Sequence, residues 1–237
     1  MSRPALVLAL ALAAAPARAE DARDAYVASN LLAVLYHELG HALIDTGDLP
    51  VFGQEEDAAD TLSILMIDTL FDDDTARTIA YDTADGFAAD ARLAADDIAW
   101  WDTHGPDAQR YYNLVCLFYG ADPDTRDDFA ADMGLPDDRA DTCPEEYDLA
   151  IDSWGPVLDE LMAQGGTAGL IYTGTGTSLT HRTIKDEVRA LNAVMTMPAP
   201  LRVSVAPCGE PNAFYDPQDI SITICTEFED YLRKNSP

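Results

Sequence analysis

The sequence predicts a mainly helical α+β fold, with a helix pair near the N-terminus and a small disulfide-linked β-hairpin near the C-terminus. Apolar residues recur at helical spacing over most of the first 164 positions, whereas two short segments after position 200 alternate apolar and polar residues. The chain has 237 residues, of which 48% are hydrophobic and 24% are charged, as is typical of a globular protein. It is therefore long enough to bury an ordinary core.

The helices follow from apolar residues spaced three and four positions apart. The first is expected over residues 21–46, because Gly47, Asp48 and Pro50 end it. Further helices are expected at about residues 54–70, 75–101, 108–119, 123–133, 145–164 and 182–195.

The C-terminal part is expected to contain the strands. Residues 165–178 are rich in Gly and Thr and are expected to form an irregular linker. Residues 201–206 and 220–225 alternate apolar and polar side chains, as strands with one buried face do. Turn residues at 215–217 lie between them, so residues 201–226 are expected to form a β-hairpin within a single domain, residues 20–237.

Residues 1–19 have the features of a secretory signal peptide. Arg3 supplies a positive charge, residues 5–15 are apolar, and Ala17-Arg18-Ala19 forms an A-x-A cleavage site. The apolar run is too short to span a bilayer, and no later stretch is long enough, so no stable membrane anchor is expected. The protein is therefore expected to be exported, and to be periplasmic or secreted after cleavage at Ala19.

Export permits disulfides, and the chain has four cysteines. Four cysteines allow three pairings, of which we favour the two sequence-local bridges, Cys116–Cys143 and Cys208–Cys225. Four buried free thiols are the alternative. The C-x-x-C spacing of a cysteine zinc site does not occur.

Acidic residues dominate the charge of the chain. The 43 Asp and Glu residues outnumber the 14 Lys and Arg residues, which gives a formal net charge of −29. Such a chain repels phosphate backbones and anionic lipid surfaces, so nucleic-acid binding is excluded and membrane adsorption is disfavoured. Peptides and proteins remain as partners, and the charge favours basic peptides over acidic ones.

The strongest functional signal is the H-E-x-x-H motif at residues 37–41, on the first predicted helix. His37 and His41 are four residues apart, so they lie on one helix face and can bind one zinc ion. Glu38 lies beside them, where it can take a proton from a zinc-bound water. The alternative is a helix that carries two histidines and no metal.

A third ligand is expected at the start of the second helix, which is rich in acidic residues. Antiparallel packing of the two helices would return Glu56 to the histidines. Asp60, four residues later on the same face, could then accept the free N–H of a ligand histidine. Two histidines and one carboxylate leave a zinc position open for water, which is the pattern of catalytic sites. Glu55 is the competing ligand, and a solvated acidic helix start is the alternative without metal.

These residues resemble the gluzincin metallopeptidases. More closely, the chain resembles a bacterial family that is assigned as metallopeptidases and whose substrate is not established. The matching segments are residues 37–45, 49–50, 55–60, 102–104, 109–113, 116, 119–120, 143–147 and 208–215. They cover most of the chain after the signal peptide, and the resemblance implies a zincin-like helix pair and a zinc-dependent peptidase.

Residues 104–110 are similar to an H-P-P-x-x-x-R motif of the CAAX-prenyl endopeptidases and their soluble periplasmic relatives, with Gly105 in place of the first proline. In that group the motif lies at the active site. The resemblance implies that His104 donates to the oxyanion or gates the metal, and that Arg110 supports it. A loop histidine on the surface is the alternative for His104.

Asn212, Ala213 and Phe214 are similar to a segment of the same peptidases that forms the sheet edge along which the substrate lies extended. In that group the segment precedes the H-E-x-x-H helix, whereas here it follows every other motif. The resemblance therefore implies a rearranged topology in which the C-terminal hairpin packs beside the first helix. A hairpin that only stabilises the fold is the alternative.

The sequence thus predicts an exported zinc-dependent peptidase that contains one zinc ion. The second hypothesis is a catalytically silent zinc-binding module with a peptidase-like fold, which captures peptides or a partner. Glu38 favours the enzyme, because metal binding alone requires only the ligands. A disulfide-stabilised structural protein without metal is the third hypothesis, and it leaves the spacing of the histidines and acids unexplained.

Overall fold

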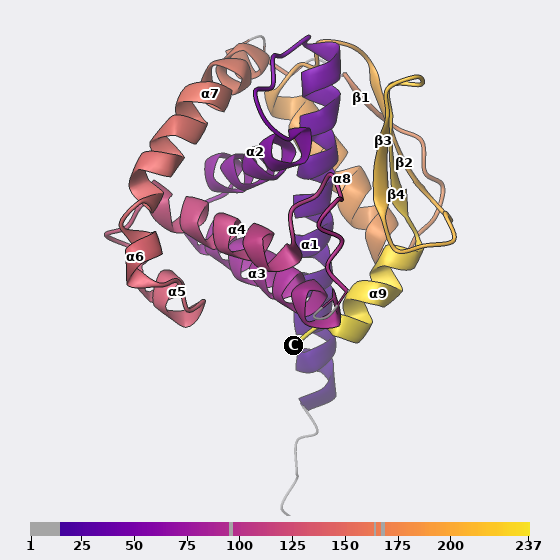
Figure 1. Ribbon diagram of the computed structural model, residues 1–237. Coiled ribbons are helices and arrows are strands. Elements are labelled where there is room, and N and C mark those ends of the chain that lie inside the picture. Colours follow the sequence, from indigo (N-terminus) through magenta and orange to yellow (C-terminus); the bar gives the residue numbers. More distant parts are fainter. Residues whose placement is uncertain (1–14, 95–96, 164, 167–168) are drawn as a thin grey trace, which may run out of the picture.

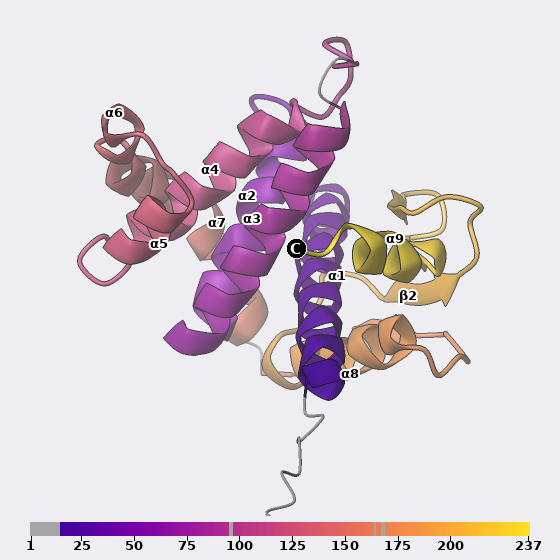
Figure 2. The ribbon, with the colours of Figure 1, turned by 90° about the horizontal axis from the view of Figure 1, so that it is seen from below.

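The computed structural model describes residues 15–94, 97–163, 165–166 and 169–237, and one long helix, α1 (Ala15–Thr46), runs through its middle (Figure 1). The helices on one side of α1 are α2 (Glu55–Leu70), α3 (Asp73–Ala94), α4 (Asp107–Ala121), α5 (Asp127–Asp132), α6 (Asp137–Ala140) and α7 (Cys143–Ala163). The elements on the other side are β1 (Leu170–Tyr172), α8 (Leu179–Val194), β2 (Leu201–Ala206), β3 (Ala213–Asp216), β4 (Ser221–Cys225) and α9 (Glu227–Asn235). The view from below in Figure 2 shows the same division.

The burial of α1 explains its apolar sequence. It packs against α2 and α3 on one side and against α8, α9 and β3 on the other, so side chains all round the helix leave water. The helix ends at Thr46, as predicted, where the N–H of Gly47 donates to the carbonyl of Leu43 at 2.9 Å. Of the predicted signal peptide, residues 1–14 lie outside the described residues, and the remainder is continuous with α1.

The mainly helical α+β class is confirmed, but the predicted pairing of residues 201–226 is wrong. The described strands form a mixed sheet in the order β1-β2-β4-β3, in which β2 and β4 are parallel, with Val203 opposite Ile222. The C-terminal hairpin consists of β3 and β4, which are antiparallel. Alternation along a strand shows which face is buried, but it does not show which strand lies beside it.

Two other elements differ from the sequence prediction. β1 lies within the predicted linker, residues 165–178, part of which is outside the described residues, and it pairs in parallel with β2. The third predicted helix is shorter than expected, because α3 ends at Ala94 and the described residues 97–106 form a loop. Trp100 and Trp101 on this loop are 78% and 87% exposed, so their apolar character does not indicate a buried helix face.

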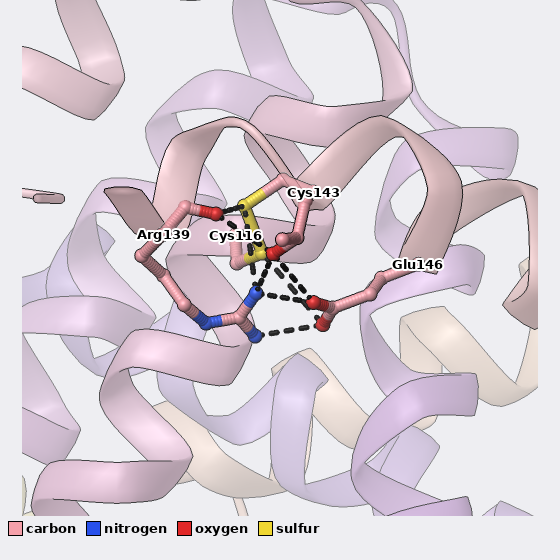
Figure 3. The surroundings of a disulfide bond; sticks show 5 residues. Cys116, Arg139, Cys143 and Glu146 are labelled. Atoms are coloured by element: carbon pink, nitrogen blue, oxygen red, sulfur yellow. Dashed lines mark hydrogen bonds and ion pairs between the residues drawn. A yellow bond between two sulfur atoms is a disulfide. The ribbon is translucent and has the colours of Figure 1, made fainter. Parts of the chain in front are cut away.

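Both favoured disulfides are present. Cys116 of α4 bonds to Cys143 at the start of α7, and Cys208 bonds to Cys225 at the end of β4. Beside the first bridge, the guanidinium of Arg139 pairs with both carboxylate oxygens of Glu146, at 2.5 and 2.7 Å (Figure 3). Among the described helices, none has the combination of length and apolar composition that crossing a membrane requires.

Candidate metal centre

The centre is built where α1 and α2 pass close to each other. Glu56 near the start of α2 meets His41, whereas Ser63 further along α2 donates to the carbonyl of Ala33 at 2.8 Å, so the two helices run antiparallel. Gly40 permits this approach, because a Cβ at that position would lie 2.8 Å from the Cα of Ala59. Gly40 thus allows the acidic first turn of α2, which contains Glu55 and Glu56, to lie close to His37 and His41.

Three acceptor atoms converge between the helices. The Nε2 atoms of His37 and His41 are 3.2 Å apart, and they lie 3.2 and 3.1 Å from Oε2 of Glu56. Nitrogen lone pairs and a carboxylate oxygen repel one another at such distances unless a cation or a proton lies between them. Nitrogen and oxygen donors in this combination suit a divalent transition metal such as zinc, so these three residues could hold a metal ion.

A partly buried carboxylate orients the His37 ring. The Nδ1–H of His37 donates to Oδ1 of Asp60 at 2.7 Å, which leaves the Nε2 lone pair for the converging group. Arg110 of α4 binds the same carboxylate with two hydrogen bonds, at 2.7 and 2.8 Å. The guanidinium of Arg110 also lies 4.6 Å from the centroid of the Phe87 ring. The sequence placed Asp60 and Arg110 near the site, and the structure joins them into one chain of contacts that ends on His37.

A second carboxylate orients the His41 ring. The Nδ1–H of His41 donates to Oε1 of Glu55 at 2.7 Å, so Glu55 contacts the opposite side of the ring from Glu56. Glu55 was expected as a competing ligand, and its contact with His41 Nδ1 was not predicted from the sequence. The sequence position of Glu55 could have indicated it. Glu55 comes one residue before Glu56, so in an antiparallel helix pair it lies beside the part of α1 that carries His41.

His104 reaches the centre from the loop before α4. Its Nε2 lies 2.9 Å from Oε2 of Glu56, and its ring stacks on that of His37 with centroids 5.9 Å apart. The backbone N–H of His104 donates to Oδ1 of Asp102 at 3.1 Å, which fixes the turn of the loop. The side chain is 41% exposed, so it lies at the boundary between the converging group and solvent.

The contacts within the centre shift the pKa values of His37 and Glu56 in opposite directions. Burial lowers the pKa of His37, but its hydrogen bonds to Asp60 and Glu56 outweigh burial and raise the pKa to about 9. Burial raises the pKa of Glu56, but the imidazoles of His104, His37 and His41 hold it well below the ordinary value. The group therefore favours positive charge at the point where its atoms converge.

Glu38 lines a large cavity together with His37, Asp60 and His104, and its environment differs from theirs. It is 7% exposed, and burial raises the pKa of its carboxyl above the ordinary value, against the opposing effect of His37 and His41. Asn212 and Ala213, at the start of β3, also line this cavity, whereas Phe214 is 41% exposed. Tyr215 of β3 donates to Oδ2 of Asp45 at 2.6 Å and ties the strand to the end of α1. The structure thus places residues 212–213 on the wall of the large cavity that Glu38 also lines.

A comparison with family models gives one match. A model of the DUF4344 family, described as "Putative metallopeptidase", matches residues 9–158 and 177–236, which include every side chain of the centre. No curated protein and no solved structure matches the chain at a significant level. Since the matched residues make up most of the sequence, the chain belongs to the DUF4344 family, whose description is "Putative metallopeptidase".

Proposed function

We propose that the protein is an exported zinc-dependent peptidase of the gluzincin type. The observation that carries the proposal is the convergence of His37 Nε2, His41 Nε2 and Glu56 Oε2 beside the buried carboxylate of Glu38. Two imidazoles and one carboxylate are the donor set of catalytic zinc sites, which keep a further position for water. A bound zinc ion would lower the pKa of a water molecule to about 7 and polarise a peptide carbonyl.

Glu38 is the proposed general base. Burial raises the pKa of its carboxyl, which makes the carboxylate a better proton acceptor and suits a group that takes a proton and returns it to the leaving amine. Metal binding does not require this residue, because Glu38 makes no contact with the converging atoms in any described hydrogen bond. Its burial in the same cavity supports a role in turnover rather than in holding the ion.

His104 is the proposed donor to the oxyanion. Its imidazole lies at the edge of the centre, half exposed, with Nε2 directed at Glu56 and the ring stacked on His37. A ring in this position can donate a hydrogen bond to an oxygen that becomes negative during attack on the carbonyl. Arg110 is assigned a supporting role through Asp60 and His37.

The proposed substrate is an extended peptide that lies along β3. Within the described sheet β3 has a strand neighbour on one side, β4, so its other edge is unpaired by strands. Asn212 and Ala213 at the start of this strand line the cavity that contains Glu38. Pairing of a peptide with a sheet edge would supply main-chain hydrogen bonds independent of side chains.

Export is proposed from the features of residues 1–19 together with the disulfides. Both bridges require an oxidising compartment to form and persist, as the periplasm or the extracellular medium provides. We propose that cleavage after Ala19 removes a leader with two arginines and no acid, so the mature chain is more negative than −29.

The test is digestion of a peptide library by the wild type and by Glu38→Gln, each with zinc and with a chelator. We expect the wild type to cleave peptides, the chelator to abolish cleavage, and Glu38→Gln to lower turnover by about 10²-fold or more. Glu160→Gln is the matched control, because Glu160 is exposed on α7 and should cleave like the wild type. A wild type that holds zinc and cleaves nothing would instead indicate a zinc-binding module that captures peptides.

A further inference from the structure

A second, smaller pocket opens beside His104, between the start of α2 and the loop before α4. Its volume is about 270 Å³, and its lining includes Gln54, Asp57, Trp100, Asp102, His104 and Gln109. His104 is shared with the candidate metal centre, where its Nε2 lies 2.9 Å from Glu56. Pockets that hold a whole small molecule are generally larger, about 300–1,000 Å³, so this one has the size for a single side chain.

An exposed indole forms one wall of the pocket. Trp100 is 78% exposed, although the large apolar indole is mostly buried in the average protein. The face of an indole attracts an ammonium or guanidinium group through its quadrupole. Trp100 therefore provides a surface that a long basic side chain could cover with both its aliphatic stem and its charged end.

Carboxylates form the other side. Among the described residues, no hydrogen bond or ion pair reaches the side chain of Asp57, which is exposed at the mouth of the pocket. Asp102 is bound through Oδ1, which accepts the N–H of His104 at 3.1 Å and lies 3.5 Å from His104 Nδ1. Within the described part of the chain, neither Lys nor Arg lines this pocket, so His104 is the one basic side chain of the lining that faces its carboxylates.

We propose that this pocket binds a lysine or arginine side chain of the peptide substrate, next to the bond that is cleaved. The inference rests on the proposed peptidase function and names the substrate class of that site. The cation lies over Trp100 and faces Asp57 and Asp102, while Gln54 and Gln109 offer amide oxygens to its N–H groups. The same carboxylates repel acidic side chains. The preference is therefore a difference in affinity between basic and acidic side chains.

The test uses two ten-residue peptides that differ at one central position, lysine in one and norleucine in the other. Their dissociation constants are measured by calorimetry on zinc-loaded Glu38→Gln, which removes turnover from the readout. We expect lysine to bind about twofold to tenfold more tightly, the range of one cation–π contact or ion pair at a partly exposed site. Cleavage by the wild type, measured as kcat/KM, should show the same order.

The variants separate the pocket from the overall charge of the protein. Trp100→Ala and Asp57→Asn should bring the lysine-to-norleucine ratio close to one. Trp101→Ala and Asp124→Asn are the matched controls, since Trp101 is exposed outside the pocket lining and Asp124 is exposed on a distant loop, and they should keep the ratio. Equal binding of the two peptides, or a ratio that survives Trp100→Ala, overturns the inference. Absence of cleavage by the wild type would overturn the proposed function, and the binding ratio would still decide about the pocket.

Discussion

The two histidines of the motif are supported in different ways. The His37 ring is held by Asp60, whose side chain is 20% exposed and which is bound in turn by two hydrogen bonds from Arg110. The His41 ring is held by Glu55, whose side chain is 50% exposed and which has no further partner among the described side chains. Both carboxylates lie 2.7 Å from their ring nitrogens, so the difference is in what surrounds them.

Because the surroundings differ, we expect the two hydrogen bonds to hold their imidazole rings with different strength although their lengths are equal. Water competes for an exposed carboxylate and weakens its hold on the imidazole, whereas a buried one is held in place and its charge is poorly screened. We therefore expect the orientation of His37 to be a fixed property of the fold. The orientation of His41 should depend mainly on its position on α1 and on Glu56.

The largest effect on stability is expected when Arg110, which binds the carboxylate that holds His37, is replaced. Arg110→Met leaves the Asp60 charge partly buried and without its cation, so we expect a loss of about 3 kcal/mol or more in the free energy of unfolding. The matched control is Arg189→Met, because Arg189 is 84% exposed and should change stability by no more than about 0.5 kcal/mol. Urea denaturation measures both, and similar losses in the two variants would mean that the Arg110–Asp60 pair does not anchor the centre.

The next largest effect is expected on zinc affinity, when the carboxylates of Asp60 and Glu55 are replaced one at a time. Asp60→Asn and Glu55→Gln each remove one negative charge with little change of shape. We expect zinc affinity to fall about 10- to 100-fold for Asp60→Asn, the usual cost of losing such an outer partner, and by less than about tenfold for Glu55→Gln. Competition with a chromogenic chelator gives both constants, and equal losses would contradict the distinction between the two supports.

A smaller effect on stability is expected at Gly40. This residue sets the distance between α1 and α2, and therefore the position of both histidine supports. Helix propensity alone predicts that Gly40→Ala stabilises α1 by about 1 kcal/mol. The added Cβ would lie 2.8 Å from Ala59, however, so α2 must move, and we expect a net loss of about 1–2 kcal/mol together with weaker zinc binding. Gly53→Ala is the control, since a Cβ there meets nothing within 4 Å. A Gly40→Ala protein that is more stable and binds zinc normally would show that the close approach is not needed.

The parts of the molecule that the sequence predicts well depend on local spacing. The placement of His37 and His41 on one face of α1 follows from the helix period, and the end of that helix follows from Gly47 and Pro50. The antiparallel return of α2 follows from the short connection, and it brings Glu56 and Asp60 to the motif. The fold class and both disulfide bridges could also be predicted in this way.

The remaining features depend on contacts between distant segments. The alternation of apolar and polar residues in β2 and β4 does not predict that the two strands pair in parallel. Each pattern shows which face of its strand is buried, but it does not show which strand lies beside it. The roles of Glu55 and Glu56 differ by one position on a helix, and only the relative rotation of α1 and α2 decides which acid reaches between the rings. The position of His104 over His37 depends on a loop, for which periodicity carries no information.

We propose that this centre holds zinc and that Glu38 acts there as the general base of peptide hydrolysis. The most direct test of this proposal is to measure zinc content by plasma mass spectrometry and peptide turnover on the same preparations of wild type and Glu38→Gln. We expect about one zinc ion per chain in both proteins and cleavage by the wild type alone. A folded wild type that binds no zinc from a zinc-containing buffer, or a Glu38→Gln protein that cleaves as fast as the wild type, would contradict it.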